Sequence, residues 1–321
     1  MNFRQIRRDA YRVASAQSCA ASRMDANETA AFARELEEID ATLYEKKYPA
    51  YKGLDLVPVK RVSEGADLYT EQVIEQFGSA EELVNYADDP PMSDVNATES
   101  SGKLFSFWSG FQYTVQDARR SKLMRVPVEA KRAEAARKVL AKKLNDVIFS
   151  GISTRGVTGL LNNASVSLVT SGLTGTWSGA TASQIVADIQ TLEMTVFNDS
   201  KGVEQPDTLL LPLSLYRLLS KPIGDNVDKT VLGFLMQPGT LAFVKNIEWA
   251  YDLETADAGG TGPRAVIYRR DSEAVEALVA IEFVTHPTMQ KNLSWVTPCE
   301  TRTGGVVFHY PGSARYCDVL G

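Results

Sequence analysis

The chain has 321 residues, of which 44% are hydrophobic and 23% charged, so it is long enough for one large domain or two closely packed ones. Its formal net charge of -6 excludes a protein that binds nucleic acid through an overall basic charge. Three cysteines without a CxxC pair, together with only two histidines, argue against a disulfide framework or a histidine-based metal site. We expect buried thiols in a reducing compartment.

The first 47 residues predict an arm followed by a helix. Residues 1–26 begin basic and are rich in Ala and Ser, without the apolar core of a secretory signal. Residues 27–47 predict a helix with one apolar stripe, formed by Phe32, Leu36, Ile39 and Leu43. The arm offers this stripe no partner surface, so we expect it to pack partly against a neighbouring subunit.

The middle of the chain predicts strands and then one long helix. Residues 54–61, 68–77 and 104–116 have strand character, whereas residues 85–91, which end in two prolines, exclude regular helix or an inner strand. Residues 128–149 predict a continuous helix about 33 Å long. Its apolar stripe consists of Ala133, Ala136, Leu140, Leu144 and Val147. We expect this stripe to face a sheet that contains the carboxyl-terminal strands.

The remaining residues alternate between helix and strand patterns. Thr181 is a candidate cap for a helix at 181–197, and residues 208–211 form a buried strand that leads into a short helix. The further expected segments are helices at 212–220 and 229–236, and strands at 241–249, 264–269, 275–284, 294–296 and 306–308. No repeating βαβ rhythm is present, so the sequence predicts an α+β fold.

The sequence offers no catalytic, cofactor or metal site. The chain has no P-loop, no GxGxxG after a strand and no GxSxG. Asp88 and Asp89 are typical of an exposed acidic turn, and His286 and His309 lie in apolar strand context, where we expect structural roles. No run approaches the roughly 20 apolar residues that span a bilayer. We expect a protein without cofactors that is made in a cytoplasm.

Charge is distributed unevenly between two adjacent segments. From Ser63 to Glu99 there are ten acids and no Lys or Arg, while residues 117–143 hold ten bases and three acids. Both segments are either solvated faces or surfaces with partners of opposite sign, in the same subunit, in a neighbour or in nucleic acid. The candidates for such contacts are Glu81, Glu82, Asp88, Asp89, Arg119, Arg120, Lys122 and Arg125.

Four segments, taken in order, resemble the major capsid proteins of tailed bacteriophages of the Hong Kong 97 type. Residues 156–162 (GVTGLLN) follow the long helix, and residues 206–216 (PDTLLLPLSLY) lead a strand into a helix. Residues 301–311 (TRTGGVVFHYP) and 85–90 (NYADDP) are similar to one subfamily. Each segment alone is a weak signal, and the order of the four carries the resemblance.

The resemblance implies a shell-building subunit with a defined domain plan. It implies an amino-terminal arm (1–50), an extended loop (about 62–104) within a peripheral domain (51–165), an axial domain (166–280) and returning strands (281–321). It also implies hexamers and pentamers of this chain in an icosahedral shell around double-stranded DNA, with portal, scaffold and decoration proteins as further partners. Such a shell is assembled in the bacterial host cytoplasm and ends in the virion.

Within this plan, the acidic loop projects from the body and has to lie on something. DNA phosphates would repel its acids, so we expect it to cross the Arg119, Arg120, Lys122 or Arg125 region of a neighbouring subunit. Lys138, Lys142 and Lys143, further along the long helix, are the candidates for facing the genome. Two alternatives remain: an encapsulin-like shell that encloses cargo proteins, and a soluble enzyme of unrecognised family. The contents of purified particles distinguish the first, and a monomer with a ligand-sized pocket would favour the second.

Overall fold

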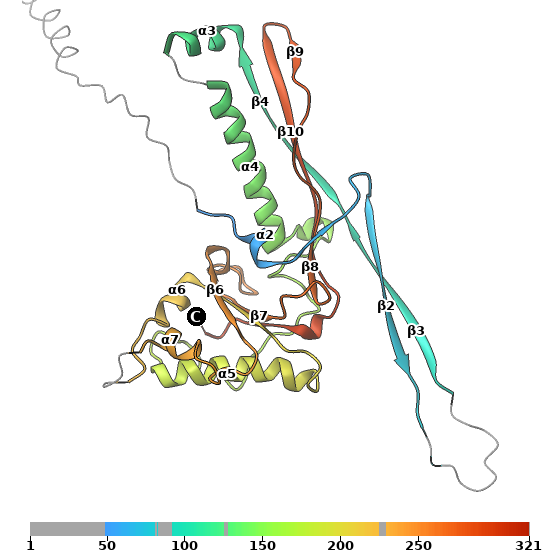
Figure 1. The fold of residues 1–321 in the computed structure, drawn as a ribbon, viewed down its shortest axis with the longest axis vertical. Coiled ribbons are helices and arrows are strands. Elements are labelled where there is room, and N and C mark those ends of the chain that lie inside the picture. Colours follow the sequence, from blue (N-terminus) through green and yellow to red (C-terminus); the bar gives the residue numbers. More distant parts are fainter. Residues whose placement is uncertain (1–48, 81, 83–91, 125–127, 225–228, 321) are drawn as a thin grey trace, which may run out of the picture. The chain divides into compact units, whose positions relative to one another are not determined.

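The computed structural model of the protein describes residues 49–80, 82, 92–124, 128–224 and 229–320. Tyr51–Gly321 form one compact unit and Met1–Ala50 another, and the fold is described here for the first of these units. Its described strands make a five-stranded sheet, a four-stranded sheet and a separate two-stranded ribbon (Figure 1). Helices accompany both sheets, as an α+β fold requires.

The elements follow the chain in a mixed order. The strands are β1 (Val59–Arg61), β2 (Leu68–Phe77), β3 (Asp94–Lys103), β4 (Phe105–Thr114), β5 (Thr208–Pro212), β6 (Asn246–Ala250), β7 (Ala265–Tyr268), β8 (Val275–Thr285), β9 (Met289–Lys291), β10 (Ser294–Phe308) and β11 (Ala314–Cys317). The helices are α2 (Gly53–Leu56), α3 (Val115–Met124), α4 (Val128–Ser150), α5 (Ala182–Asp199), α6 (Leu213–Leu218) and α7 (Val231–Leu235), with 3-10 turns η1 (Ser153–Arg155), η2 (Tyr251–Leu253) and η3 (Pro311–Ser313).

The five-stranded sheet is built around β10. Its order is β1-β8-β10-β4, with β9 also paired to β10, so β4 is an edge strand. The sequence predicts two short strands where the structure has this single strand of 15 residues. Its middle contains threonines instead of apolar residues, but they are buried and bonded: the Thr301 hydroxyl donates to the Ile281 carbonyl (3.0 Å) and the Thr303 hydroxyl to that of Leu278 (2.7 Å).

Helix α4 lies along this sheet and confirms the long helix predicted over 128–149 (Figure 1). Ala136, Leu140, Leu144 and Val147 are each no more than 5% exposed, and Ala133 is half-buried. The stripe packs against β4, β8 and β10, which include the expected carboxyl-terminal strands. The side chains that Ala136 and Leu140 meet there are Phe107, Phe111, Phe283 and Cys299.

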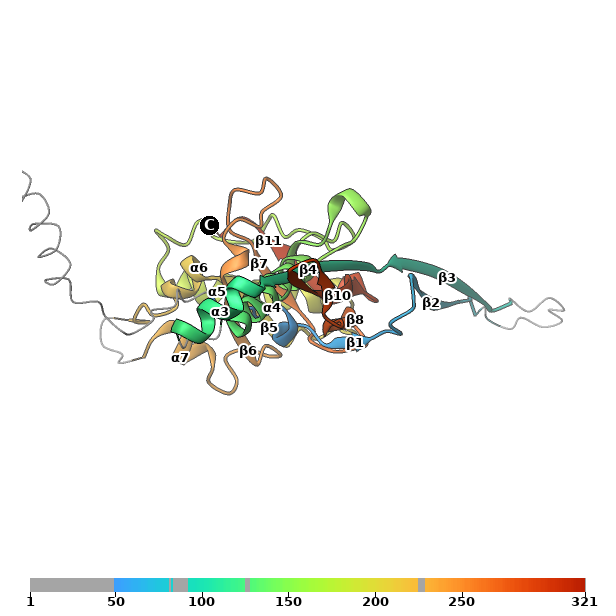
Figure 2. The same ribbon diagram turned by 90° about the horizontal axis from the view of Figure 1, so that it is seen from above.

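The ribbon of β2 and β3 leaves the five-stranded sheet at Leu104. Its register runs from Leu68 opposite Lys103 to Phe77 opposite Asp94, and neither strand has another strand partner among the described residues. Leu104, which is 5% exposed, is the single residue between β3 and β4. In both views β3 therefore continues the line of β4 (Figures 1 and 2).

The four-stranded sheet has the order β11-β7-β5-β6 and packs against α5. The predicted cap of α5 is confirmed, because Thr181 and Gln184 bond reciprocally to each other's backbone N–H groups in a capping box. The predicted apolar face is also buried, and it consists of Ile185, Ile189, Leu192 and Val196. Together with β5 and β7 these side chains form the core of this half of the unit.

Two buried carboxylates on α5 hold neighbouring loops. Asp188 accepts a hydrogen bond from the indole Nε1 of Trp177 (2.8 Å), and both side chains are buried. Glu193, which is 2% exposed, accepts from three consecutive backbone N–H groups. The donors are Ala242 (3.1 Å), Phe243 and Val244 (2.8 Å). These bonds satisfy backbone groups that the loop would otherwise bury without partners.

Glycines allow three backbone segments to approach one another where α4 ends. A Cβ on Gly159 would lie 2.4 Å from the carbonyl oxygen of Phe149. A Cβ on Gly305, whose φ is +80°, would lie 2.3 Å from the carbonyl oxygen of Thr158. Only glycine fits both positions. The segment 156–162 therefore joins the end of α4 to β10 through close backbone contacts.

The structure corrects several expected elements. The strand expected over 54–61 is real only at Val59–Arg61, because Gly53–Leu56 form a helical turn whose first N–H bonds to Asn145 Oδ1 (3.0 Å). The strand expected over 241–249 begins only at Asn246, since Glu193 holds the preceding loop. The strand expected over 104–116 ends at Thr114, where the unexpected helix α3 begins. The helix expected at 27–47 and the segment 85–91 lie outside the described residues.

Candidate subunit-contact surface

Helix α3 carries three of the expected contact bases at the end of β4. Arg119, Arg120 and Lys122 are all exposed on it. A reciprocal cap fixes where the helix begins: the N–H of Asp117 donates to Thr114 Oγ1 (3.2 Å), and the N–H of Thr114 donates to Asp117 Oδ2 (3.3 Å). The cap satisfies donors that the first turn would otherwise leave unpaired.

Arg132, on the first turns of α4, holds α3 in position. Its Nη1 donates to Asp117 Oδ2 (3.0 Å) and to the carbonyl oxygen of Gln112 on β4 (2.6 Å). The hydrogen bond from Arg132 lowers the pKa of Asp117 below its usual range. The guanidinium thus joins β4, α3 and α4, and the bases of α3 are presented from a braced helix.

The extended loop has the opposite charge. The described acids that are exposed and belong to it are Glu64, Asp67, Glu75, Glu82, Asp94 and Glu99. Asp67 nevertheless contacts Arg302 of the body, and Glu71, whose side chain is only 11% exposed, contacts His309. These two acids are engaged within the subunit, which narrows the acidic surface available to a neighbour to the outer part of the loop.

Other contact candidates lie outside the described residues. These are Glu81, Asp88 and Asp89 in the loop, Arg125 after α3, and the arm residues Phe32, Leu36, Ile39 and Leu43. Their roles stay predictions.

Acidic loop and basic helix lie at opposite ends of β4. The ribbon meets β4 at Leu104, whereas α3 begins directly after Thr114. Ten residues of strand at about 3.4 Å each separate the two ends by about 34 Å. Figure 1 shows the ribbon and α3 leaving β4 in different directions. The structure thus brings Arg119, Arg120 and Lys122 together on α3 but does not bring them to the described acids of the loop in the same subunit.

The three bases expected to face the genome do not share one face of α4. Lys138 and Lys142, four residues apart, lie on the side away from the buried stripe. Lys138 pairs with Glu134 (2.7 Å). Lys143 lies on a flank, with its ammonium 5.3 Å from the ring centre of Phe107 on β4. Its cation is directed at an aromatic ring of its own subunit.

Both histidines are hydrogen-bonded, and one is the centre of a charged cluster that the sequence did not indicate. His286 Nε2 lies 3.0 Å from Glu300 Oε2. His309 touches Glu71 with Nδ1 and Glu276 Oε2 with Nε2 (3.1 Å). The partners come from distant strands, so spacing along the chain gives no sign of the cluster.

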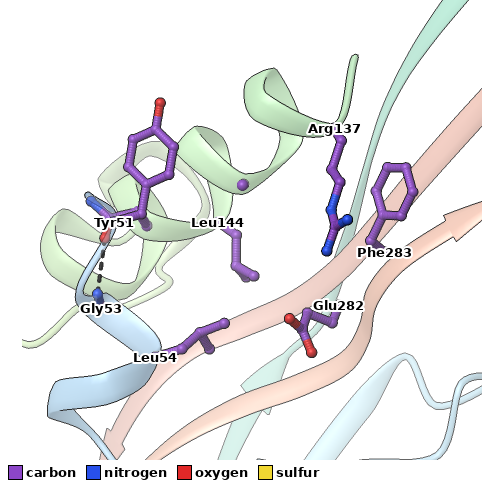
Figure 3. A pocket seen from close by; sticks show the side chains of 9 residues that line it. Tyr51, Gly53, Leu54, Arg137, Leu144, Glu282 and Phe283 are labelled. Carbon is purple, nitrogen blue, oxygen red and sulfur yellow. Dashed lines mark hydrogen bonds between the residues drawn. The ribbon is translucent and has the colours of Figure 1, made fainter. Parts of the chain in front are cut away.

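A cleft of about 240 Å³ lies between α2, α4 and β8 (Figure 3). Its lining includes Leu54, Leu144 and Phe283, with Arg137 and Glu282 at one side. The guanidinium of Arg137 lies 5.8 Å from the ring centre of Phe283. No serine, cysteine or histidine is among the described residues that line this cleft.

Large apolar side chains are exposed on both the body and the ribbon. Trp108 on β4 is 81% exposed and Leu123 on α3 is 85% exposed. Near the outer end of the ribbon, Ile74, Phe77 and Val95 are each about 60% exposed. These side chains are candidates for contact with a neighbouring subunit, the kind of site that contiguous exposed apolar surface marks.

Among the described residues, no group of three or more His, Cys, Asp or Glu side chains is arranged to hold a metal ion. The same part of the chain contains no helix with the length and hydropathy needed to cross a membrane.

Comparison with known proteins identifies the family. A family model described as major capsid protein matches residues 78–320. The capsid of Myoviridae Phage XM1 is 17% identical with a TM-score of 0.79, and the match covers 90% of this chain and 98% of that one. A Mycobacterium phage Adephagia structure is 18% identical with a TM-score of 0.57, covering 87% and 91%. A virus-like particle from Pyrococcus furiosus is 12% identical with a TM-score of 0.52, covering 82% and 91%. Comparison with curated proteins gives no match.

The family model spans well over half of the chain, and the three solved structures are matched by 82–90% of it. They confirm the α+β fold of tailed-phage capsid subunits that the resemblance implied. The chain belongs to the major capsid protein family and is a shell-forming subunit of the tailed-phage type.

Proposed function

We propose that copies of this chain form a closed icosahedral shell, built from hexamers and pentamers, around the double-stranded DNA of a tailed phage. In this proposal residues 51–165 and 281–321 make the peripheral domain, residues 166–280 the axial domain and residues 1–50 the arm. The role is structural and not enzymatic. Portal, scaffold and decoration proteins are its further partners, and assembly takes place in the bacterial host cytoplasm before the shell becomes part of the virion.

The contact that holds neighbours together, in our proposal, is the acidic loop of one subunit on the basic α3 of the next. The observation that carries it is the placement of the two charges at opposite ends of β4. Arg119, Arg120 and Lys122 are exposed and braced, and Glu82 is exposed at the outer part of the loop. Since about 34 Å of strand separates them, each charged end is left for a second copy of the chain.

The ribbon's apolar surface supports the same contact. An isolated two-stranded ribbon is marginally stable in water, and this one exposes Ile74, Phe77 and Val95. Ile74 and Val95 lie on one face of the ribbon and Phe77 on the other, because Val95 pairs with Gln76. Covering Ile74 and Val95 on a neighbour that exposes Trp108 and Leu123 removes apolar surface from water on both partners. Apolar burial then supplies affinity, and the charges supply orientation and register.

Each exposed ion pair contributes only about 0–1 kcal/mol, but the contact repeats around every ring of subunits. Raising the salt to 1 M shortens the Debye length to about 3 Å and should slow assembly. The apolar part of the contact does not share this dependence. A plot of assembly rate against ionic strength therefore separates the two contributions.

Charge reversal is the sharpest test of the proposed contact. The double variant Arg119→Glu with Arg120→Glu should block assembly, as followed by light scattering and electron microscopy. The matched control Arg119→Lys with Arg120→Lys keeps both charges and should assemble. A compensating Glu81→Lys with Glu82→Lys should partly restore shells from the reversed pair. Normal shells from Arg119→Glu with Arg120→Glu alone would contradict the proposal. Circular dichroism checks that each variant still folds.

The contents of the particles test the remaining part of the proposal. Purified shells should protect double-stranded DNA from nuclease. Lys142 lies on the side of α4 away from the buried stripe, and Lys142→Glu should reduce the amount of protected DNA per shell. Lys138 and Lys143 are the further genome-facing candidates, although Lys143 is partly committed to Phe107. Shells that contain enzyme cargo instead of DNA would favour an encapsulin-like role.

A further inference from the structure

His309 lies at the end of β10 between two carboxylates that come from different parts of the fold. Its Nδ1 contacts Glu71 on β2, and its Nε2 lies 3.1 Å from Glu276 Oε2 on β8. The same Glu276 oxygen lies 2.8 Å from the ammonium of Lys60 on β1. The side chains of His309, Glu71 and Glu276 are only 14%, 11% and 10% exposed. Water therefore screens this cluster poorly.

The number of protons on the imidazole decides whether the cluster is stable. A carboxylate can only accept hydrogen bonds, and a neutral imidazole has a single N–H to donate. With two carboxylates at its two nitrogens, a neutral His309 would turn a lone pair towards one of them. The imidazolium donates to both and brings the sum of charges over His309, Lys60, Glu71 and Glu276 to zero.

Among the described residues, no cation other than His309 is bonded to Glu71. Glu71 from β2, Glu276 from β8 and Lys60 from β1 are the charged groups bonded within the cluster, and Tyr69 lies with its ring 5.3 Å from the Lys60 ammonium. The pKa of Lys60 is raised above its usual range by its bond to Glu276, so this lysine is committed to that carboxylate. Lys103 on β3 lines the adjoining cavity together with Glu71, but no bond between the two is formed.

Glu71 belongs to the base of the extended loop, whereas His309 and Glu276 belong to the five-stranded sheet. Two further charged ties between loop and body are present among the described residues. Arg302 contacts Asp67, but the Asp67 side chain is 92% exposed, so this ion pair contributes little. The Lys60 ammonium, which bonds to Glu276, also lies 5.3 Å from the ring centre of Tyr69 on β2. His309 with Glu71 is therefore the shielded ion pair between the ribbon and the body in the described part of the chain.

We propose that His309 is a proton-dependent latch that sets the position of the extended loop on its own subunit. The imidazolium holds β2 against the sheet, and loss of its proton releases Glu71 and frees the base of the ribbon. A rise in pH through the titration of His309 thus loosens the loop, and a fall fastens it. Only the effect of the latch on assembly rests on the proposed function, because the loop is the proposed contact with a neighbouring subunit.

Two substitutions separate the latch from a general effect on folding. In His309→Gln the amide donates to one carboxylate and carries no charge, so the loop base should be loose at every pH. In His309→Lys a permanent cation donates to both carboxylates, so the base should stay fastened at every pH. His286→Gln is the matched control, because His286 bonds to Glu300 in the same sheet without touching the loop.

Hydrogen exchange on the full chain, diluted until light scattering detects no assembly, gives the readout. Amides at 69–72 and 100–103 should lose protection about tenfold or more when His309 is deprotonated, since a charge-assisted bond is lost. Amides of α5 report whether the fold is intact. The chain has two histidines, so ¹⁵N-histidine spectra of the wild type and of His286→Gln assign the titration of His309 in the same samples.

The expected result is that protection at the loop base follows the His309 titration in the wild type and in His286→Gln, but not in either His309 variant. Loop protection that ignores this titration would overturn the latch, as would equal protection in His309→Gln and His309→Lys. Because the measurement is made on single subunits, failure of the charge-reversal experiment in shells leaves this result unaffected.

Discussion

Replacing Glu193 by glutamine tests how much a single buried carboxylate contributes to the stability of the half of the fold that is built on the four-stranded sheet and α5. The carboxylate accepts three backbone N–H groups, at 242, 243 and 244, and glutamine keeps its size. The amide oxygen can accept two of these donors, but the amide NH₂ is itself a donor and faces the third. One buried N–H then lacks an acceptor, which costs about 1–3 kcal/mol.

The two remaining bonds change from charge-assisted to neutral, at about 1 kcal/mol each. Glutamine avoids the desolvation of a carboxylate, which offsets part of this loss. We therefore expect Glu193→Gln to lower the free energy of unfolding by about 2–3 kcal/mol net. For a unit of this size, that corresponds to a fall in Tm of roughly 4–8 °C.

Thermal unfolding of unassembled subunits measures this change, and hydrogen exchange of amides 242–244 localises it. Met194→Gln is the control, since the neighbouring side chain is 39% exposed and bonds to nothing in the loop. Glu193→Ala, which leaves all three donors unpaired, should be worse than Glu193→Gln. If Glu193→Gln and Met194→Gln unfold at the same temperature, the hydrogen-bond account of this loop is wrong.

Two further predictions concern the long helix and the arm. Leu140→Ala should lower the free energy of unfolding by about 2–3 kcal/mol. This is the lower part of the usual range, because the small cluster around Leu140 borders half-buried aromatic rings that can relax into the cavity. Urea unfolding measures the change, and Val139→Ala, at an exposed neighbour, should change the stability little. Deleting residues 1–47 should leave a foldable subunit that assembles poorly, and closed shells of normal yield from the truncated chain, seen by electron microscopy, would contradict a role for the arm.

Periodicity predicted the elements whose apolar residues face one side. The stripes of α4 and α5 repeat at helical spacing, and the cap at Thr181 has the right partner three residues later. Residues 209–211 are all leucines, as expected for a central strand that is covered on both faces. In these segments local pattern and tertiary packing agree, so the sequence alone was sufficient.

The missed elements are stabilised by residues far away in the sequence. α3 has no apolar face, and its position depends on Arg132 of another helix; only Thr114 with Asp117, a capping pair three residues apart, signalled it. β3 is polar along most of its length and exists as a strand because it pairs with β2. Periodicity does not register pairing of this kind.

The candidate site was predicted in its charges but not in its connections. The imbalance between the acidic and basic segments is visible in the composition, and the structure adds that a whole strand separates them. The contact of Glu71 with His309 could not be predicted, since the two residues are 238 positions apart in the sequence and neither belongs to a motif. The apolar strand context of His309 predicted a structural role, and its hydrogen bonds support that role. The same context gave no sign that both of its partners would be acidic.

Leu104 gives the subunit a pivot that leaves its ladders of hydrogen bonds intact. On one side of this residue β3 bonds only to β2, and on the other side β4 bonds only to β10. A tilt of the ribbon at Leu104 would leave the rungs of both ladders in place and would strain the contacts at its base, which include the bond from the Leu104 N–H to the Asp67 carbonyl oxygen (3.1 Å). A shell that closes with both five-fold and six-fold rings needs one sequence to meet its neighbours at more than one angle. We expect the junction at Leu104 to provide this tolerance, because the strain of misfit would then be confined to a few contacts at the base of the ribbon.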